Sequence, residues 1–255
     1  MISLDALRNI AGIKHITNLG YAEKDYLLDM ILFSISKHTK DELVFKGGTC
    51  LYKFYKITRF SEDIDFSCIK QLNIDLLLKK IISDLALFGI PAQLKEKKEA
   101  DSSFLITLHV QGPLYDGKHH SLCSIRIDLN LKSEVLLQPA LTIYNSLYPL
   151  IPSYSLLLMQ EQEIFAEKIR AILHRDYARD VYDLWFLSNK GILFDKDLVE
   201  KKLTYYKERW DYKRFLVRLQ EKENIWQKEI GNLLVGTIPL FKDVKKDILA
   251  RITAR

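Results

Sequence analysis

The spacing of apolar residues predicts helices over much of the chain. Between residues 22 and 38, apolar positions recur every three or four residues, which is the period of one helix face. Gly89 and Pro91 follow another such stretch and are typical of a helix end. The same spacing predicts further helices over 4–11, 75–88, 159–175, 178–189, 195–206, 212–234 and 244–251.

Short strands are predicted between the first helices. Residues 43–45 form an apolar run that ends at a Gly-Gly pair, as a strand entering a turn does. Thr49 follows that pair and is expected to cap a short helix to about Tyr55. Strands are also predicted over 61–67, 104–110 and 124–131.

The texture of the sequence changes near residue 150. After Pro149 and Pro152 the strand signals give way to helical ones. We therefore expect a mixed α/β domain over 1–150 and a helical domain over 151–255. The predicted fold class is α+β, a mixed sheet flanked by helices and followed by helices alone.

Composition and charge narrow the class of protein. Hydrophobic residues make up 48% of the 255 residues and charged residues 28%, the balance of a globular protein. The net charge of +5 permits a polyanionic partner without requiring one. Cys50, Cys68 and Cys123 have no zinc-site spacing and are expected to be reduced packing residues. No leader and no membrane span is expected, so the predicted location is the cytoplasm.

Two aspartates share one face of a predicted strand after the glycine turn. Asp63 and Asp65 are two residues apart, so their carboxylates point the same way. Repulsion between them favours a cation, and Mg²⁺ prefers carboxylate oxygen. Two solvated aspartates on an edge strand would give the same pattern. The turn at Gly47 and Gly48 lets backbone amides approach a phosphate, although ordinary turns also contain such pairs.

A third acid, Asp128, lies within an otherwise apolar strand. An unpaired buried carboxylate is costly, so this position needs a reason. If its strand lies beside that of Asp63 and Asp65, the three acids can hold two metal ions. An exposed acid paired with Arg126 is the ordinary alternative. His119 and His120, in an expected hairpin loop, are not expected to bind metal.

The order of these motifs resembles a known family. A glycine turn, a short helix, an Asp-x-Asp strand and a later Asp strand occur in this order in polymerase β-type nucleotidyltransferases. The runs Lys-Gly-Gly-Thr-x-Leu from 46 and Arg-x-Ser-x-Asp-Ile-Asp-Phe from 59 resemble the abortive-infection toxins of the AbiEii/AbiGii type. A Glu-Lys pair at 167–168 and an Arg-Asp-x-Tyr-Asp-Leu segment at 179–184 extend the likeness. Gly48 departs from the serine of the wider group, and Thr49 could supply the hydroxyl.

The resemblance implies a role for each motif. Asp63, Asp65 and Asp128 would bind catalytic Mg²⁺ or Mn²⁺. Lys168 would offset charge on the phosphates, and Asp180 is the acid that the second motif marks as functional. Solvent exposure of Lys168 is the ordinary alternative. The residues implied in nucleotide binding are Lys46, Gly47, Gly48, Thr49, Ser61, Arg175 and Arg179.

The implied activity is transfer of a nucleoside monophosphate from an NTP to an acceptor, with release of pyrophosphate. In the family resembled, the acceptor is the 3′ end of tRNA, and the toxin is encoded beside an antitoxin. Two alternatives stay open on the sequence. The acceptor could be a protein or small molecule, or the chain could bind NTP as a regulator without catalysis.

Overall fold

The computed structural model describes residues 1–100, 102–131, 134–234 and 236–252. The chain forms two compact units. Unit 1 comprises residues 1–54, 61–135 and 139–158, and unit 2 comprises residues 55–60, 136–138 and 159–255. The boundary predicted near residue 150 falls inside unit 1.

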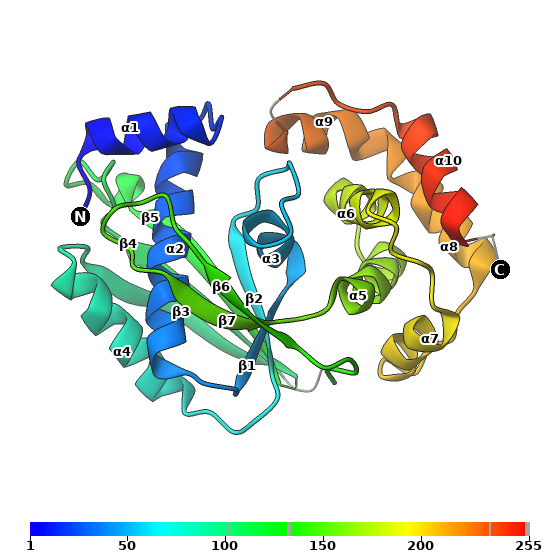
Figure 1. The fold of residues 1–255 in the computed structure, drawn as a ribbon, viewed down its shortest axis with the longest axis horizontal. Coiled ribbons are helices and arrows are strands. Elements are labelled where there is room, and N and C mark those ends of the chain that lie inside the picture. The colour runs from blue at the N-terminus through cyan, green and yellow to red at the C-terminus, as the bar shows by residue number, and fades with distance from the viewer. Residues whose placement is uncertain (101, 132–133, 235, 253–255) are drawn as a thin grey trace. The chain divides into compact units, whose positions relative to one another are not determined.

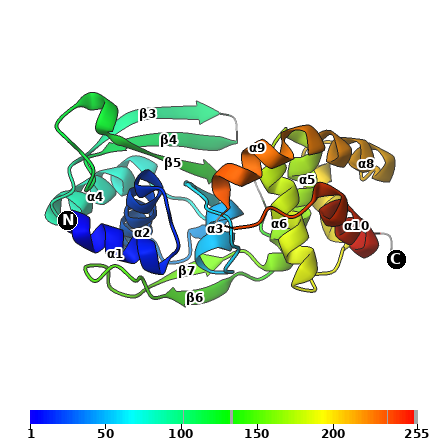
Figure 2. The same ribbon diagram turned by 90° about the horizontal axis from the view of Figure 1, so that it is seen from above.

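Unit 1 is built on a mixed sheet of seven strands within the described residues. Their order in the sheet is β3-β4-β5-β2-β1-β7-β6, and Figure 2 shows β3, β4 and β5 side by side. The β2–β5 and β1–β7 pairs are parallel and the other pairs are antiparallel. The expected α+β class is therefore confirmed. The strands are β1 (Leu43–Lys46), β2 (Asp63–Cys68), β3 (Ala92–Ala100), β4 (Ser103–Val110), β5 (Cys123–Asn130), β6 (Ala140–Tyr144) and β7 (Tyr154–Leu158).

Unit 1 contains four α-helices in its described residues. Ser3, Asn18 and Asn73 begin three of them, and each side chain accepts a hydrogen bond from a first-turn amide. The long helix α2 runs along the sheet (Figure 1) and contacts β5 and β7, while α4 contacts β3. The four helices are α1 (Leu4–Ile13), α2 (Leu19–His38), α3 (Gly47–Lys53) and α4 (Ile74–Leu87).

One face of the sheet forms the core of unit 1. Ile64 and Phe66 of β2 and Ile127 and Leu129 of β5 are almost fully buried. These residues are paired across the two strands, so they point to the same side. Burial of each such side chain contributes about 1.5–3 kcal/mol.

The opposite face is polar where β2 and β5 meet. It carries Asp63 and Asp65 on β2 beside Arg126 and Asp128 on β5. Arg126 is exposed and the three aspartates are half-buried. We call this side of the sheet the acidic face. The alternation of apolar and polar residues predicted over 61–67 and 124–131 therefore places the apolar side chains in the core and the polar ones on the acidic face.

A buried ion cluster ties α3 to α2. The Lys53 ammonium lies 2.6 Å from a carboxylate oxygen of Asp25 and 2.5 Å from one of Asp29. Tyr148 donates a hydrogen bond of 2.8 Å to Asp25. All three charged side chains are at most 1% exposed, so the helix after the glycine turn is fixed to the centre of unit 1.

Unit 2 is helical in its described residues apart from an isolated bridge, where Arg59 pairs with Leu234. The α6 helix contacts α5, α9 and α10, and its Leu184 and Leu187 are fully buried. The segment 55–60 belongs to this unit, and the Phe60 amide donates to the carbonyl of Leu233. The helices are α5 (Glu161–His174), α6 (Ala178–Asn189), α7 (Lys196–Thr204), α8 (Tyr212–Glu221), α9 (Glu223–Leu233) and α10 (Phe241–Ile252).

Two sequence predictions about elements were wrong, and three strands were missed. The helix predicted over 212–234 is two helices that meet at Lys222, whose ammonium is buried against Asp176. Thr49 does not cap α3, because the helix begins at Gly47. The strands β3, β6 and β7 were not predicted. None of the described helices has the length and apolarity needed to cross a bilayer.

Candidate active site

The structure brings the three predicted acids to adjacent strands. The β2 and β5 strands are parallel, and Asp65 is the direct partner of Asp128. Asp63 is the partner of Arg126, two residues earlier on β5. Directly paired residues project to the same side of a sheet, so the three carboxylates stand on the acidic face.

Asp63 is engaged by an arginine that the sequence interpretation left in a minor role. The Arg126 guanidinium donates from Nε (2.8 Å) and from a terminal nitrogen (3.1 Å) to the two carboxylate oxygens of Asp63. Such a fork is the strongest geometry for an arginine–carboxylate pair. The alternative weighed for Arg126 paired it with Asp128, whereas this fork is to Asp63. The sequence signal for this role was that Arg126 and Asp128 lie two residues apart on one predicted strand and so share a face.

Three carboxylates do not converge on one point in this arrangement. Across the described ranges, no group of three carboxylate, imidazole or thiolate side chains is placed to hold a metal ion. The donor chemistry nevertheless fits a hard divalent cation, because Asp65 and Asp128 are paired and Asp63 follows on the same face. Asp63, Asp65 and Asp128 are therefore the side chains that could hold one.

The glycine turn lies directly against Asp65. Gly47 has φ +75°, and a Cβ added there would lie 2.3 Å from an Asp65 carboxylate oxygen. Only glycine meets both conditions without strain. Lys46, which precedes it on β1, is the strand partner of Asp65 and is 8% exposed. The turn and the acid pair are thus one local structure.

Thr49 and Ser61 join this turn to β2. The Thr49 hydroxyl is buried and contacts the carbonyl oxygen of Asp63 and, at 3.0 Å, the Ser61 hydroxyl. The Thr49 hydroxyl is thus occupied within the protein, and the backbone amides of the turn are the other candidates for contact with an anion. The Gly48 amide belongs to this first turn of α3.

Unit 2 holds the other predicted site residues in a chain of buried charges. Lys168 lies 2.8 Å from Asp180 and 2.6 Å from Asp183, and its side chain is 8% exposed. The alternative that Lys168 extends to solvent is therefore wrong. Arg59 donates to both oxygens of Asp183 at 2.5 and 2.7 Å. Removing one partner of such a buried pair typically costs about 3–5 kcal/mol.

Arg175 and Arg179 lie at the edge of this network. Arg175 contacts Asp180 at 3.2 Å. Burial by itself would raise the pKa of Asp180, but the charges of Lys168 and Arg175 outweigh it and lower the pKa. Arg179 stacks over the Tyr177 ring at 4.4 Å. Asp183, in the same helix, is bound instead by Arg59 and Lys168.

Arg59 was not singled out from the sequence, although it opens the motif that runs from 59 to 66. It is 2% exposed and belongs to unit 2, while Asp63 and Asp65 belong to unit 1. A buried arginine is seldom found without a paired carboxylate. The sequence signal for this pair was an arginine beside apolar residues, because such an arginine, once buried, needs a carboxylate partner.

The fold is that of known nucleotidyltransferases. MenT4, nucleotidyltransferase toxin Rv2826c from Mycobacterium tuberculosis H37Rv, superposes with a TM-score of 0.65 at 19% identity, covering 97% of this chain and 88% of that one. A putative nucleotidyltransferase from H. pylori gives 0.57 at 20% identity, covering 90% and 91%. JHP933 from Helicobacter pylori gives 0.56 at 18% identity, covering 98% and 91%. No curated protein matched the sequence.

The match to a family of sequences, rather than the shared fold, defines the class as a nucleotidyltransferase. The sequence profile of the nucleotidyl transferase AbiEii toxin family, of type IV toxin–antitoxin systems, matches residues 31–249. The chain belongs to this family, and the resemblance seen in its motifs is confirmed. It is a nucleotidyltransferase toxin, and its system implies an antitoxin and an NTP substrate.

Proposed function

We propose that this protein is a Mg²⁺-dependent enzyme that transfers a nucleoside monophosphate from an NTP to the 3′ end of an RNA, with tRNA as the acceptor. The observation that carries the proposal is the pairing of Asp65 with Asp128 on the acidic face, with Gly47 packed against Asp65. The acceptor follows from the family resemblance, and translation in the cytoplasm is then the target.

The acids have separate duties in this proposal. Asp63 and Asp65 hold the divalent cation, whose charge polarises the phosphates when it is bound. Asp128, on the neighbouring strand, faces the acceptor hydroxyl and accepts its proton. The amides of Gly47 and Gly48 contact the phosphates furthest from the reacting bond.

The reaction exchanges one phosphorus–oxygen bond for another. The acceptor hydroxyl oxygen forms a bond to the α-phosphorus, and the bond between the α-phosphorus and the bridging oxygen of the β-phosphate breaks. Pyrophosphate leaves with that electron pair, and the hydroxyl proton passes to Asp128 and then to solvent. The family resemblance, and not a contact in the structure, gives Lys168 and Arg175 a role at the phosphates. Within unit 2, Asp180 sets the position of both cations.

Labelled NTPs incubated with total RNA and total protein test the acceptor. We expect label in small RNA with the wild type and more than about a hundredfold less with Asp65→Asn, because a carboxylate that binds the cation is worth several kcal/mol. Asp197→Asn, on an exposed turn of α7, is the matched control and retains transfer. Label that enters protein and not RNA contradicts the proposed acceptor.

Growth after induced expression tests the toxin activity in cells. Wild type is expected to arrest growth, and Asp63→Ala is expected to permit it. Both proteins must accumulate to the same level and show the same melting temperature. Arrest by the alanine variant would mean that toxicity does not depend on the acidic face.

A further inference from the structure

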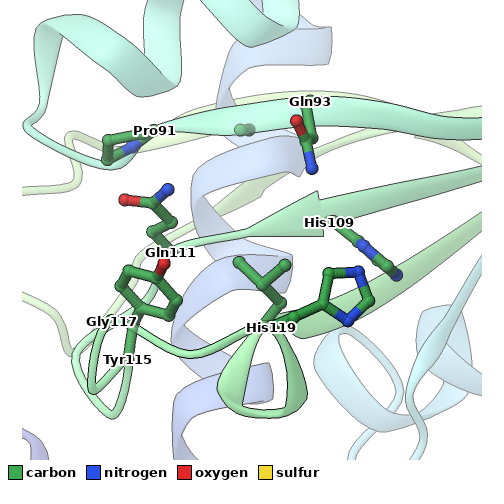
Figure 3. A pocket seen from close by; sticks show the side chains of 9 residues that line it. Pro91, Gln93, His109, Gln111, Tyr115, Gly117 and His119 are labelled. Atoms are coloured by element: carbon green, nitrogen blue, oxygen red, sulfur yellow. The ribbon is translucent and has the colours of Figure 1, made fainter.

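A pocket opens on the acidic face at β4 and β3, beginning on the strand next to that of Asp128. Figure 3 shows His109, His119, Gln93, Gln111 and Tyr115 around it. Its volume is about 400 Å³, within the usual range for a small-ligand site. The site described above does not use any of these side chains.

The strand register places this pocket on the same side of the sheet as Asp128. Gln93 pairs with His109, and His109 pairs with Ser124 of β5. Ser124 is four residues before Asp128, so both project to the acidic face. With about 5 Å between strands and about 3.4 Å per residue, His109 lies roughly 14 Å from Asp128.

In the order of the strands, the glycine turn lies on one side of the acids and the pocket lies on the other. The glycine turn follows β1, the acids lie on β2 and β5, and the pocket is formed at β4 and β3. A triphosphate held at the glycine turn therefore lies on one side of Asp128. The pocket lies on the other side, from which an acceptor must approach.

The surface between the acids and the pocket suits a nucleic-acid strand. Leu105, the β4 partner of Asp128, is 46% exposed and offers an apolar surface. Thr107, the partner of Arg126, follows on the same face and is half-buried. Arg126 lies beside this path as an exposed positive charge, although its fork is engaged by Asp63.

The chemistry of the pocket fits a nucleobase better than an anion. None of its nine lining residues is a lysine or an arginine. The His119 ring stands edge-on to the buried His109 ring, with centroids 5.4 Å apart. Burial, with Lys95 and His119 nearby, lowers the pKa of His109, so its imidazole is neutral near pH 7. Neutral imidazole and the two glutamine amides each offer a donor and an acceptor to a base edge.

The loop that closes the pocket is held in place. The Leu114 amide donates to a carboxylate oxygen of Glu23 at 2.7 Å. A Cβ on Gly112 would lie 2.5 Å from that carboxylate, so a side chain there would have to displace Glu23. Ser121 donates to Asp116 at 2.5 Å across the base of the loop. A pocket fixed in this way does not need to be ordered by its ligand.

We propose that this pocket binds a nucleobase from the 3′-terminal segment of the acceptor RNA. The inference rests on the proposed function, because it assumes that the acceptor is a nucleic acid. It adds a recognition site that holds the acceptor while its terminal hydroxyl reaches Asp128. Base stacking and edge hydrogen bonds, with no lysine or arginine in the lining, are the means of recognition.

Binding of a short fluorescein-labelled RNA ending in CCA tests the proposal. We expect His119→Ala and Gln93→Ala each to weaken RNA binding roughly tenfold, the scale of one lost base contact. Both side chains are exposed, so the variants should fold, and a melting curve checks this. His120→Ala is the control, because that side chain is 75% exposed and lies outside the pocket lining. NTP binding should be equal in all four proteins.

RNAs with one abasic position locate the contact. Wild type should lose about tenfold affinity for one abasic site among the last positions, and His119→Ala should be indifferent to that same site. Loss of NTP binding in the pocket variants would instead assign the pocket to the incoming nucleotide. RNA binding equal to that of His120→Ala would overturn the inference while label transfer to RNA upholds the proposed function. If the wild type transfers no label to RNA, the proposed function itself is contradicted.

Discussion

At the scale of single residues, the backbone of Gly47 packs directly against the Asp65 side chain. Its φ of +75° and the 2.3 Å between a would-be Cβ and Asp65 make two demands that alanine cannot meet. We expect Gly47→Ala to lower transfer more than tenfold, because Asp65 or the turn must move and positioning errors of this size are costly. Steady-state kinetics with varied NTP measure the effect.

Gly191→Ala separates backbone strain from the contact with Asp65. Gly191 has φ +88° and nothing within 4 Å of its would-be Cβ. Both variants should lose about 1–2 kcal/mol of stability, the usual cost of left-handed backbone in a residue with a side chain. Only Gly47→Ala should lose activity, and equal activity in the two would show that the contact with Asp65 is unimportant.

At the scale of elements, the buried Lys53 fixes α3 to α2. Lys53→Met keeps the length of the side chain and leaves Asp25 and Asp29 without their main counter-charge. We expect the free energy of unfolding to fall by about 3–5 kcal/mol. Urea unfolding at pH 7 measures this, with Lys80→Met, on the exposed side of α4, as control.

The pH dependence of that difference has a definite sign. Burial opposes ionisation of Asp25, but Lys53 and Lys14 outweigh it and lower its pKa to about 2. A lowered pKa stabilises the folded state above about pH 4, the unfolded value, and the effect is lost as pH falls toward 2. In Lys53→Met, protonation of the buried Asp25 and Asp29 removes their unpaired charges. The difference in the free energy of unfolding between this variant and wild type should therefore narrow from pH 7 to pH 4. A constant gap would contradict this account of the cluster.

The sequence predicted the two strands that carry the acids better than the edges of the sheet. Alternation of apolar and acidic residues marked β2 and β5, because one face of each strand is core. The edge strand β3 is almost wholly polar, and Lys95, Lys97 and Lys98 along it suit an edge more than a core. It therefore had no apolar period to recognise. The break at Lys222 depends on a contact with Asp176, 46 positions away, which no local pattern encodes.

The partners of the site residues were also beyond local patterns. The fork from Arg126 to Asp63 depends on the β2–β5 register, which separates the two residues by 63 positions in sequence. The pair between Arg59 and Asp183 spans 124 positions. Motifs indicated which residues are candidates for the site, and only the fold shows which charges lie against them.

At the scale of the whole molecule, the charge of +5 bears on how the acceptor is bound. If about four cations contact phosphates of a single strand, affinity should fall roughly fiftyfold between 50 and 200 mM salt. Anisotropy titrations with the short RNA at several salt concentrations measure the slope. Binding that is insensitive to salt would contradict an acceptor held through its backbone.

The two units are interleaved along the chain, which passes between them after residues 54, 60, 135, 138 and 158. During translation, Arg59 is therefore synthesised long before Asp183. Until then, the Arg59 guanidinium has no Asp183 carboxylate to pair with. A product cut short near residue 158 would retain that cation with no counter-ion to receive it. Each unit is assembled from separate stretches of the chain, so cutting the gene at a single point is not expected to yield a stable copy of either unit.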